Sequence, residues 1–329
     1  MNVNNKVNVM VMAVGSPLGQ SILKAVKLSS YVDNLYAADI SERAAGLHFE
    51  NVQPVILPLV KENSYFDELT DLIERNDIKV IFPTISVEHE FFAKYASYFN
   101  ERKIDIVSCG TSVFEICNDK YESMQYLRQN GIAAPATVLG CEHDAIEEFI
   151  TRYGFPLVIK PRNGASSNDV FVIKSKDRLL ALLDAYPRDY FVVQEYLEDP
   201  KDYTAGVYVS SSGDFNDVII FERDLKFGLS YSGKIIIDEN IKKYCLSIAN
   251  ALKSTYSINI QFKMMAGQPY CYEINPRLSS TTSIRAHFGF NEPDMIIRDI
   301  IGINLPREQK PAQAGMFMRY WEEIYQEEN

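Results

Sequence analysis

Residues 261–277 have the sequence QFKMMAGQPYCYEINPR, which predicts a β-hairpin with one polar and one apolar face. Apolar and polar residues alternate on both sides of Gly267, and a period of two is typical of strands that are buried on one face. A turn centred on Gly267 places Gln261 directly opposite Glu273. Glu273 and Asn275 are two residues apart, so their side chains point the same way. The pattern therefore brings three oxygen-bearing side chains together.

The alternation divides each strand of this hairpin into two faces. The first strand has an apolar face of Ile258, Ile260, Phe262 and Met264 and a polar face of Asn259, Gln261 and Lys263. The second strand has Tyr270, Tyr272 and Ile274 on one face and Cys271, Glu273 and Asn275 on the other. Oxygen ligands with few carboxylates and no imidazole suit Mg²⁺ shared with phosphate better than zinc or a full calcium cage. A surface hairpin with solvated polar residues is the alternative interpretation.

The end of the hairpin adds a cation. Pro276 ends the second strand and favours an extended conformation at Asn275, which leaves Arg277 at the mouth of the predicted site. A guanidinium in this place can bind a phosphoryl or carboxylate oxygen through two parallel hydrogen bonds.

Composition and charge limit the class of protein. The chain has 329 residues, of which 47% are hydrophobic, and this length predicts two or three domains. A net charge of −11 argues against nucleic acid or an anionic membrane as the main partner. Five cysteines without a CxxC pair indicate reduced thiols in a cytoplasmic protein. No apolar run approaches the roughly 20 residues that span a bilayer.

Residues 1–115 alternate strand and helix patterns, which is typical of a parallel, doubly wound Rossmann-like domain. Gly15 and Gly19 flank the first turn, and Asp39 ends the second strand about 20 residues later, in the manner of a dinucleotide-binding fingerprint. The motif is GxxxG, however, and lacks the G-x-G that allows the backbone to approach pyrophosphate. An NAD site and a purely structural tight turn both remain open at this point.

Residues 116–190 form a second unit, in which a helix ends at Gly131 and the strand LVIKP leads into the loop NGASSND. Lys160 at the end of this strand is either solvated or directed at an anion. The small loop residues Gly164, Ala165, Ser166 and Ser167 can offer backbone N–H groups and hydroxyls to phosphate. The absence of GxxxxGK[ST] from the sequence excludes a P-loop NTPase.

Residues 191–310 form a third unit that contains the hairpin, and residues 311–329 form a tail. Glu195 and Asp202 are either two surface acids, the default for such residues, or part of a nucleotide site. In the second case the strand edge at residues 194–197 offers backbone groups to a purine, and Asp202 accepts from ribose hydroxyls. The segment GMFMRYW in the tail predicts a strand or helix that packs back on the body.

Four motifs taken in order resemble the ATP-grasp superfamily. They are DK at 119–120, YGFPLVIKP at 153–161, QEYL with DYT within 194–204, and EINPR at 273–277. The chain is most similar to the branch that contains the large chain of carbamoyl phosphate synthetase, biotin carboxylase and the pyrrolysine-pathway ligase. This resemblance implies an α/β fold, in which a Rossmann-like preATP-grasp domain precedes a two-lobed α+β ATP-grasp domain. In that family the preceding domain does not bind NAD.

The resemblance also implies roles for individual residues. ATP phosphates would contact Lys120, Lys160, Gly164, Ser166 and Ser167. Adenine and ribose would contact Glu195, Tyr196, Leu197 and Asp202. Mg²⁺ or Mn²⁺ would be held by Gln261, Glu273 and Asn275. The transferred phosphoryl group or the acyl substrate would contact Arg277, and a substrate carboxylate would be oriented by Arg223 and Arg285.

The activity implied is that of an ATP-dependent carboxylate–amine ligase, which forms an amide or peptide bond through an acyl phosphate and releases ADP and phosphate. The alternatives are a kinase of a small carboxylate or carbamate that resembles carbamoyl phosphate synthetase, an NAD-dependent oxidoreductase, and a non-catalytic nucleotide-binding regulator. The partners expected are small molecules, with a homodimer as the common default. Three positions depart from the family pattern: Asp169 and Ser280 stand in place of glycine, and Asp202 in place of glutamate.

Overall fold

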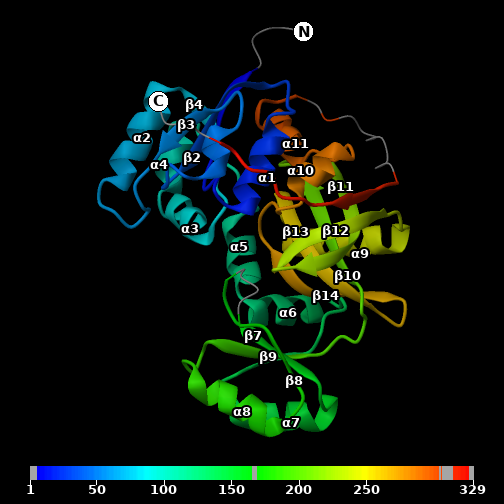
Figure 1. Cartoon of the computed structure of the whole chain (residues 1–329). Coiled ribbons are helices and arrows are strands. Elements are labelled where there is room, and N and C mark those ends of the chain that lie inside the picture. The colour runs from blue at the N-terminus through cyan, green and yellow to red at the C-terminus, as the bar shows by residue number, and fades with distance from the viewer. Residues whose placement is uncertain (1–5, 165–168, 304, 306–313, 326–329) are drawn as a thin grey trace.

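The computed structural model describes residues 6–164, 169–303, 305 and 314–325 (Figure 1). Three β-sheets form the framework, and each corresponds to one of the units expected from the sequence. All five cysteines lie in the described part of the chain and are free, and four of them are buried. Among the described residues, no helix is long and apolar enough to cross a membrane.

The first sheet is parallel and has five strands in the order β3-β2-β1-β4-β5. Its strands are β1 Val7–Val11, β2 Val32–Asp39, β3 Gln53–Ile56, β4 Ile78–Phe82 and β5 Asp105–Ile106. The helices between them are α1 Pro17–Val26, η1 Ala45–His48, α2 Tyr65–Arg75, α3 Ser86–Lys94 and α4 Ala96–Glu101. This order confirms the doubly wound Rossmann-like prediction. From β1 the chain adds β2 and β3 on one side, and it then returns to add β4 and β5 on the other side of β1. The carboxyl ends of the strands at such a switch point form a crevice for ligands.

The second sheet is antiparallel and has four strands in the order β6-β9-β7-β8. Its strands are β6 Thr137–Leu139, β7 Leu157–Pro161, β8 Phe171–Ile173 and β9 Phe191–Glu195. Helices α7 His143–Tyr153 and α8 Lys176–Ala185 cover it, while α5 Thr111–Asn118 and α6 Lys120–Gln129 lie between this lobe and the rest (Figure 1). Because β9 pairs with β6 and β7, the lobe extends to Glu195, past the expected boundary at residue 190.

The third sheet has six strands in the order β14-β13-β10-β11-β12-β15. Its strands are β10 Asp202–Val209, β11 Asn216–Lys226, β12 Leu229–Ile236, β13 Tyr256–Met265, β14 Gln268–Asn275 and β15 Met316–Met318. Its helices are α9 Glu239–Leu252, α10 Thr282–His287 and α11 Glu292–Ile300. Strand β15 comes from the tail segment GMFMRYW and pairs with β12, which confirms that this segment packs back on the body.

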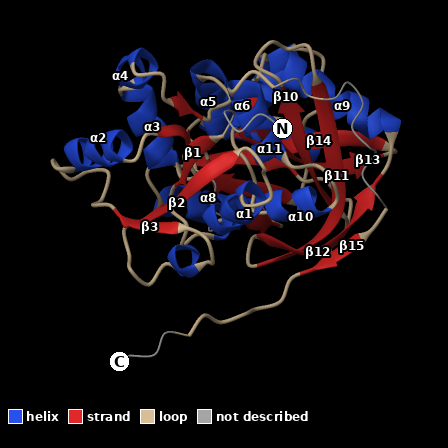
Figure 2. Cartoon of the chain, turned by 90° about the horizontal axis from the view of Figure 1, so that it is seen from above, coloured by secondary structure: helices blue, strands red, loops and turns tan. Residues whose placement is uncertain are grey.

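A continuous hydrophobic core joins the first sheet to the third. It contains Val9 and Val80 from the first sheet together with Phe221 and Ile296 from the third unit. Helix α1 packs against α10 and α11, and the views in Figures 1 and 2 agree on this contact. The small lobe has a separate core around Leu157 and Phe191. The first and third units therefore share one core, while the small lobe has a core of its own.

Candidate active site

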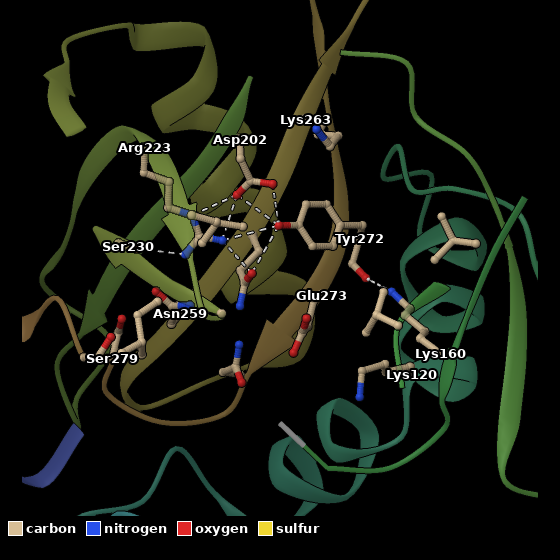
Figure 3. A pocket seen from close by; sticks show the side chains of 18 of the residues that line it. Lys120, Lys160, Asp202, Arg223, Ser230, Asn259, Lys263, Tyr272, Glu273 and Ser279 are labelled. Atoms are coloured by element: carbon tan, nitrogen blue, oxygen red, sulfur yellow. Dashed lines mark hydrogen bonds and ion pairs between the residues drawn. The ribbon is translucent and has the colours of Figure 1, made fainter. Parts of the chain in front are cut away.

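A cavity of about 550 Å³ lies where the three sheets meet (Figure 3). This volume is within the usual range for small-molecule sites. The cavity is lined by most of the expected site residues, namely Lys120, Lys160, Glu195, Tyr196, Leu197, Asp202, Arg223, Gln261, Glu273, Asn275 and Arg277. Gly164 lines a smaller adjoining cavity, and Ser166 and Ser167 lie outside the described residues.

The hairpin of β13 and β14 has the expected Gln261–Glu273 pair, but a β-bulge adds one residue near it. The turn residues Ala266 and Gly267 both have positive φ, as a two-residue type I′ hairpin turn requires. From this turn the pairing is regular as far as Phe262, which lies opposite Cys271. The pairing then shifts by one residue, so that Gln261 lies opposite Glu273.

The bulge corrects the prediction for one face of β14. Cys271 does not share the polar face with Glu273, because its side chain is fully buried in the hydrophobic core below the hairpin. Tyr272 instead turns into the cavity beside Glu273. The faces predicted for β13 are confirmed, since Ile260 and Phe262 lie in the core while Gln261 and Lys263 line the cavity.

A hydrogen-bonded network occupies one wall of the cavity (Figure 3). Arg223 donates from Nε to Asp202 at 2.8 Å and from Nη2 to the Gln261 oxygen at 2.6 Å. The Tyr272 hydroxyl donates to Asp202 at 2.8 Å. Asp202 and Arg223 face each other because β10 and β11 pair them directly. Burial holds the pKa of Tyr272 well above its usual range, so the phenol remains a donor at neutral pH.

Replacing Tyr272 with Phe tests the ribose contact that the ATP-grasp resemblance implies for Asp202. The affinity for ATP is expected to fall by about 5- to 10-fold, because Asp202 loses one of its two donors. Measurement of the Kd for ATP by titration calorimetry tests this, with Tyr270→Phe as a control on the same strand, since Tyr270 does not line the cavity. An unchanged Kd in Tyr272→Phe would show that Asp202 takes no part in nucleotide binding.

Two lysines meet at the end of β7, and Asp119 explains their position. Asp119 caps α6 by accepting from the backbone of Tyr121 and also accepts from Arg162 Nε at 2.7 Å. The cap places Lys120 beside the end of β7, where its Nζ donates to the Gly164 carbonyl. Lys160 donates to the Gln194 oxygen and to the Tyr272 carbonyl, both at 2.9 Å. Both ammonium groups are partly desolvated and contact only neutral oxygens in the described chain.

Burial lowers the pKa of Lys160 to about 8, with Glu273 raising it and Lys120 lowering it. Below this pKa the lysine is a cation that attracts phosphate, and above it the lysine is neutral. The affinity of the free protein for ATP is therefore expected to fall about tenfold for each pH unit above about 8. The Lys160→Arg variant remains charged and should show a flat profile. A wild-type affinity that does not change over this pH range would contradict the expected phosphate contact.

The donor set allows a test of whether a divalent cation fits. The Glu273 carboxylate lines the cavity, and no hydrogen bond or ion pair occupies its side chain in the described part of the chain. Within the described chain, the Asn275 side chain has only a long contact of 3.3 Å with Arg277. The Gln261 oxygen, in contrast, accepts from Arg223 at 2.6 Å, and the Tyr272 hydroxyl, whose one proton goes to Asp202, lies 3.1 Å from it. Glu273 and Asn275 thus fit Mg²⁺ as ligands, whereas the Gln261 oxygen is already bonded to the Arg223 cation.

Arg277 is a cation without an acidic partner within the described ranges. Its guanidinium donates to the Leu278 carbonyl at 2.9 Å and to Asn275 at 3.3 Å, both neutral. The nearby ring of His89 on α3 is also neutral, because burial and then the charge of Arg277 lower its pKa to about 4. Arg277 is therefore available to a negatively charged ligand.

Arg285 does not have the position expected of a residue that orients substrate. Its side chain is fully buried, forms an ion pair with Glu292 at 3.0 Å and does not line the cavity. It donates as well to Asn259, which in turn accepts from Thr204. Direct contact of Arg285 with a substrate carboxylate conflicts with this burial, and the residue supports the polar face of β13 from below.

Two further expectations concern loops. Asp169 has a φ of 58°, in the left-handed region that favours glycine, and its carboxylate accepts from the Tyr190 hydroxyl at 2.8 Å. Asp169 does not line the cavity, so its carboxylate lies outside the predicted phosphate site, as expected. In the first domain, the Asp39 carboxylate accepts from the Gly15 backbone at 2.7 Å. The structural-turn interpretation of GxxxG therefore explains this motif, because Asp39 already has a partner in the loop.

Several residues of the cavity were not expected from the sequence. Tyr272 was missed because the bulge has no local signal. Residue 194 was expected at the nucleotide site, but the bond of its side chain to Lys160 was missed, because it depends on pairing between β7 and β9. The lining from the first domain was also missed and consists of Ser16, Pro17, Leu18 and Ile85. The sequence signal that could have predicted these four residues is their position directly after β1 and β4, because both strands end at the switch point where ligands bind.

The fold and the site together define the class of protein: a Rossmann-like domain precedes two antiparallel sheets that enclose a cavity with two lysines and a polar hairpin. Comparison with known families agrees with this. Residues 117–212 match the RimK-like ATP-grasp domain. Residues 189–324 match the family described as ATP-grasp in the biosynthetic pathway with Ter operon. The chain therefore contains an ATP-grasp domain.

Individual proteins give more distant matches. A D-alanine–D-alanine ligase from Bacillus anthracis is 27% identical over 177 residues, which are 49% of this chain and 57% of that protein. The carbamoyl phosphate synthase large chain from Sulfurisphaera tokodaii is 21% identical over 65% of this chain and 22% of its own length. The N5-carboxyaminoimidazole synthetase from Staphylococcus aureus complexed with ADP has a TM-score of 0.75 at 16% identity, over 95% of this chain and 82% of that one. The first of these matches spans less than two thirds of the relative, and the last shows the fold alone.

Proposed function

We propose that the protein is an ATP-dependent carboxylate–amine ligase that forms an amide or peptide bond. The observation that carries this proposal is the composition of one cavity. It contains Lys160 at the end of β7 with Lys120 beside it, and, within the described residues, a hairpin carboxylate and Arg277 that form no ion pair. Phosphates, a metal ion and a carboxylate are the groups that such side chains bind. The similarity to D-alanine–D-alanine ligase supports the same class of reaction.

The nucleotide would lie between the small lobe and the third sheet. Lys120 and Lys160 bind its phosphates, and the backbone at residues 194–197 meets the purine. The Glu195 side chain is not available for this purpose, because its carboxylate accepts from the Ala136 backbone at 3.1 Å. Asp202, oriented by Arg223 and Tyr272, accepts from the ribose. Closure of the small lobe, which has its own core, would exclude water from the cavity.

Glu273 and Asn275 would hold Mg²⁺ or Mn²⁺, which neutralises phosphate charge when bound. Arg277 orients the substrate carboxylate, whose oxygen attacks the γ-phosphorus while the bond from phosphorus to ADP breaks. The amine then attacks the acyl carbonyl, phosphate leaves and a proton passes to solvent. Positioning and electrostatics provide most of the rate increase in such a reaction, so the cavity needs no histidine base.

Release of ADP from Mg-ATP, measured with pools of carboxylates and amines, tests the proposal. Release that requires both a carboxylate and an amine is expected. Release with a carboxylate alone, together with an acyl phosphate that hydroxylamine traps, would favour the kinase alternative. Tight binding of ATP with no release in any pool would favour a regulator and contradict the ligase.

A further inference from the structure

One end of the cavity differs in chemistry from the nucleotide end. We call it the switch-point subsite and define it by its lining residues, which are Ser16, Pro17, Leu18, Ile85, Ser279 and Ser280. The first three begin α1 after strand β1, and Ile85 precedes α3 after strand β4. Ser279 and Ser280 follow Arg277 and lead into α10, which packs against α1. The subsite therefore lies at the crevice where the strand order reverses.

The subsite contains no acidic side chain. The acids that line the whole cavity are Glu195, Asp202 and Glu273, and none of them is among the subsite residues. Arg277, beside the subsite, forms no ion pair within the described chain, although burial lowers its pKa and the charge of Glu273 raises it. A ligand here meets a cation whose hydrogen bonds go to neutral oxygens, and the subsite itself has no group that would pair with an ammonium.

The hydroxyl groups of the subsite are largely used inside their own loops. The Ser16 hydroxyl donates to the Ala13 carbonyl at 2.8 Å and accepts from the Gly19 backbone at 2.9 Å. The Ser279 hydroxyl contacts that of Thr281 at 3.0 Å. Leu18 and Ile85 are left as the apolar surface, and Ile85 remains 42% exposed at the cavity. An apolar group covering Ile85 would gain from its burial, whereas a charged group there would lose hydration without gaining a partner.

We infer that the acid activated by this protein is a monocarboxylate whose carbon chain next to the carboxylate is apolar. Its carboxylate binds Arg277, and its hydrocarbon part lies against Leu18 and Ile85. A zwitterionic α-amino acid is rejected, because its ammonium would be desolvated beside the Arg277 guanidinium and none of the subsite residues is an acid that would pair with it. A dicarboxylate is rejected because its second charge would face Ile85. This inference rests on the proposed function for the identity of the substrate, but the selectivity follows from the lining alone.

Three small acids serve as probes of the subsite. 4-Methylpentanoate and leucine have the same carbon skeleton and differ in the α-ammonium, and glutarate replaces the branched end with a second carboxylate. Titration calorimetry of the full chain with Mg²⁺ and a non-hydrolysable ATP analogue gives their Kd values. We expect 4-methylpentanoate to bind at least about 10-fold more tightly than leucine or glutarate.

Replacing Ile85 with Glu should reverse this preference, because it adds to the subsite a carboxylate that can pair with the ammonium and removes apolar surface from it. Ile85→Glu is expected to bind leucine about 10-fold more tightly than the wild type does and to lose affinity for 4-methylpentanoate. Ile56→Glu is the matched control, since Ile56 is 46% exposed on β3 of the same domain but does not line the cavity. It should leave the ratio of the two Kd values unchanged.

The inference is overturned if the wild type binds leucine or glutarate as tightly as 4-methylpentanoate, or if 4-methylpentanoate does not bind at millimolar concentration. It is also overturned if Ile85→Glu and Ile56→Glu behave alike. Failure of the proposed function has a different signature: the apolar acid binds with the expected selectivity, yet no amine supports ADP release. Conversely, ADP release with polar acids alone would keep the ligase and remove the apolar subsite.

Discussion

Replacing Glu273 with Gln is expected to lower the rate of ADP release by about two to three orders of magnitude. Gln keeps the size of the side chain but removes the charge that a divalent cation needs most, since the other available ligand, Asn275, is a neutral amide. Within the described ranges, no three His, Cys, Asp or Glu side chains are grouped closely enough to hold a metal ion. The metal site therefore depends on one carboxylate and has no acidic substitute nearby.

The loss of rate should far exceed the loss of stability. The Glu273 side chain makes no hydrogen bond or ion pair within the described part of the chain, but its charge favours the charged forms of the buried Lys120 and Lys160. We expect the free energy of unfolding of Glu273→Gln to fall by about 1 kcal/mol. Glu148→Gln, an exposed change on α7, is the control for both rate and stability. A Glu273→Gln variant that releases ADP at the normal rate would show that the metal ion is bound elsewhere.

The apparent affinity for the metal separates this role from a role in binding substrate. If Glu273 holds Mg²⁺, excess Mg²⁺ or Mn²⁺ should restore part of the rate in Glu273→Gln, because Asn275 is still present. If the carboxylate contacts an amine substrate instead, excess metal will not help and the KM for the amine will rise. A titration of rate against metal concentration at fixed ATP distinguishes these outcomes.

Short-range sequence patterns predicted the parts of the fold that are determined by residues close together in the chain. The period-two alternation around Gly267 gave the hairpin, and the strand-helix alternation of residues 1–115 gave a parallel sheet. The Gln261–Glu273 pair also needs the bulge, because the turn consists of Ala266 and Gly267 and is not centred on Gly267. The helix expected to end at Gly131 is α6, Lys120–Gln129. In each case the residues that determine the structure are within a few positions of one another.

The parts that pattern missed depend on pairing between distant segments. Tyr272 enters the cavity because a bulge shifts the register of β13 against β14, and alternation alone assigns it to the opposite face. Arg223 meets Asp202 only because β10 and β11 pair those two residues. Ile85 and Leu18 join the site because a shared core fixes the first domain against the third sheet. No short window of sequence contains this information.

Arg285 shows how an arginine near a site can belong to the framework instead. Replacing it with Met is expected to destabilise the protein by about 3 to 5 kcal/mol, because Glu292 would be left charged and fully buried without a cation, with the Ser257 hydroxyl as its remaining side-chain donor in the described chain. The Arg285 side chain also packs closely against β10, because a Cβ added at Gly206 would lie 2.2 Å from Arg285 Nη1. Urea denaturation gives the free energy of unfolding. The exposed pair Lys176–Glu147 is the comparison, and Lys176→Met should cost about 1 kcal/mol or less.

The double variant Arg285→Met, Glu292→Leu decides between framework and substrate contact. Removing both charges leaves no unpaired ion, so most of the lost stability should return. If Arg285 only supports β13 through Asn259, the stable double variant should retain the wild-type KM for the acid to within a few-fold. If Arg285 instead contacts the substrate carboxylate, stability will return while the KM rises by about 100-fold, as loss of a charged hydrogen bond predicts.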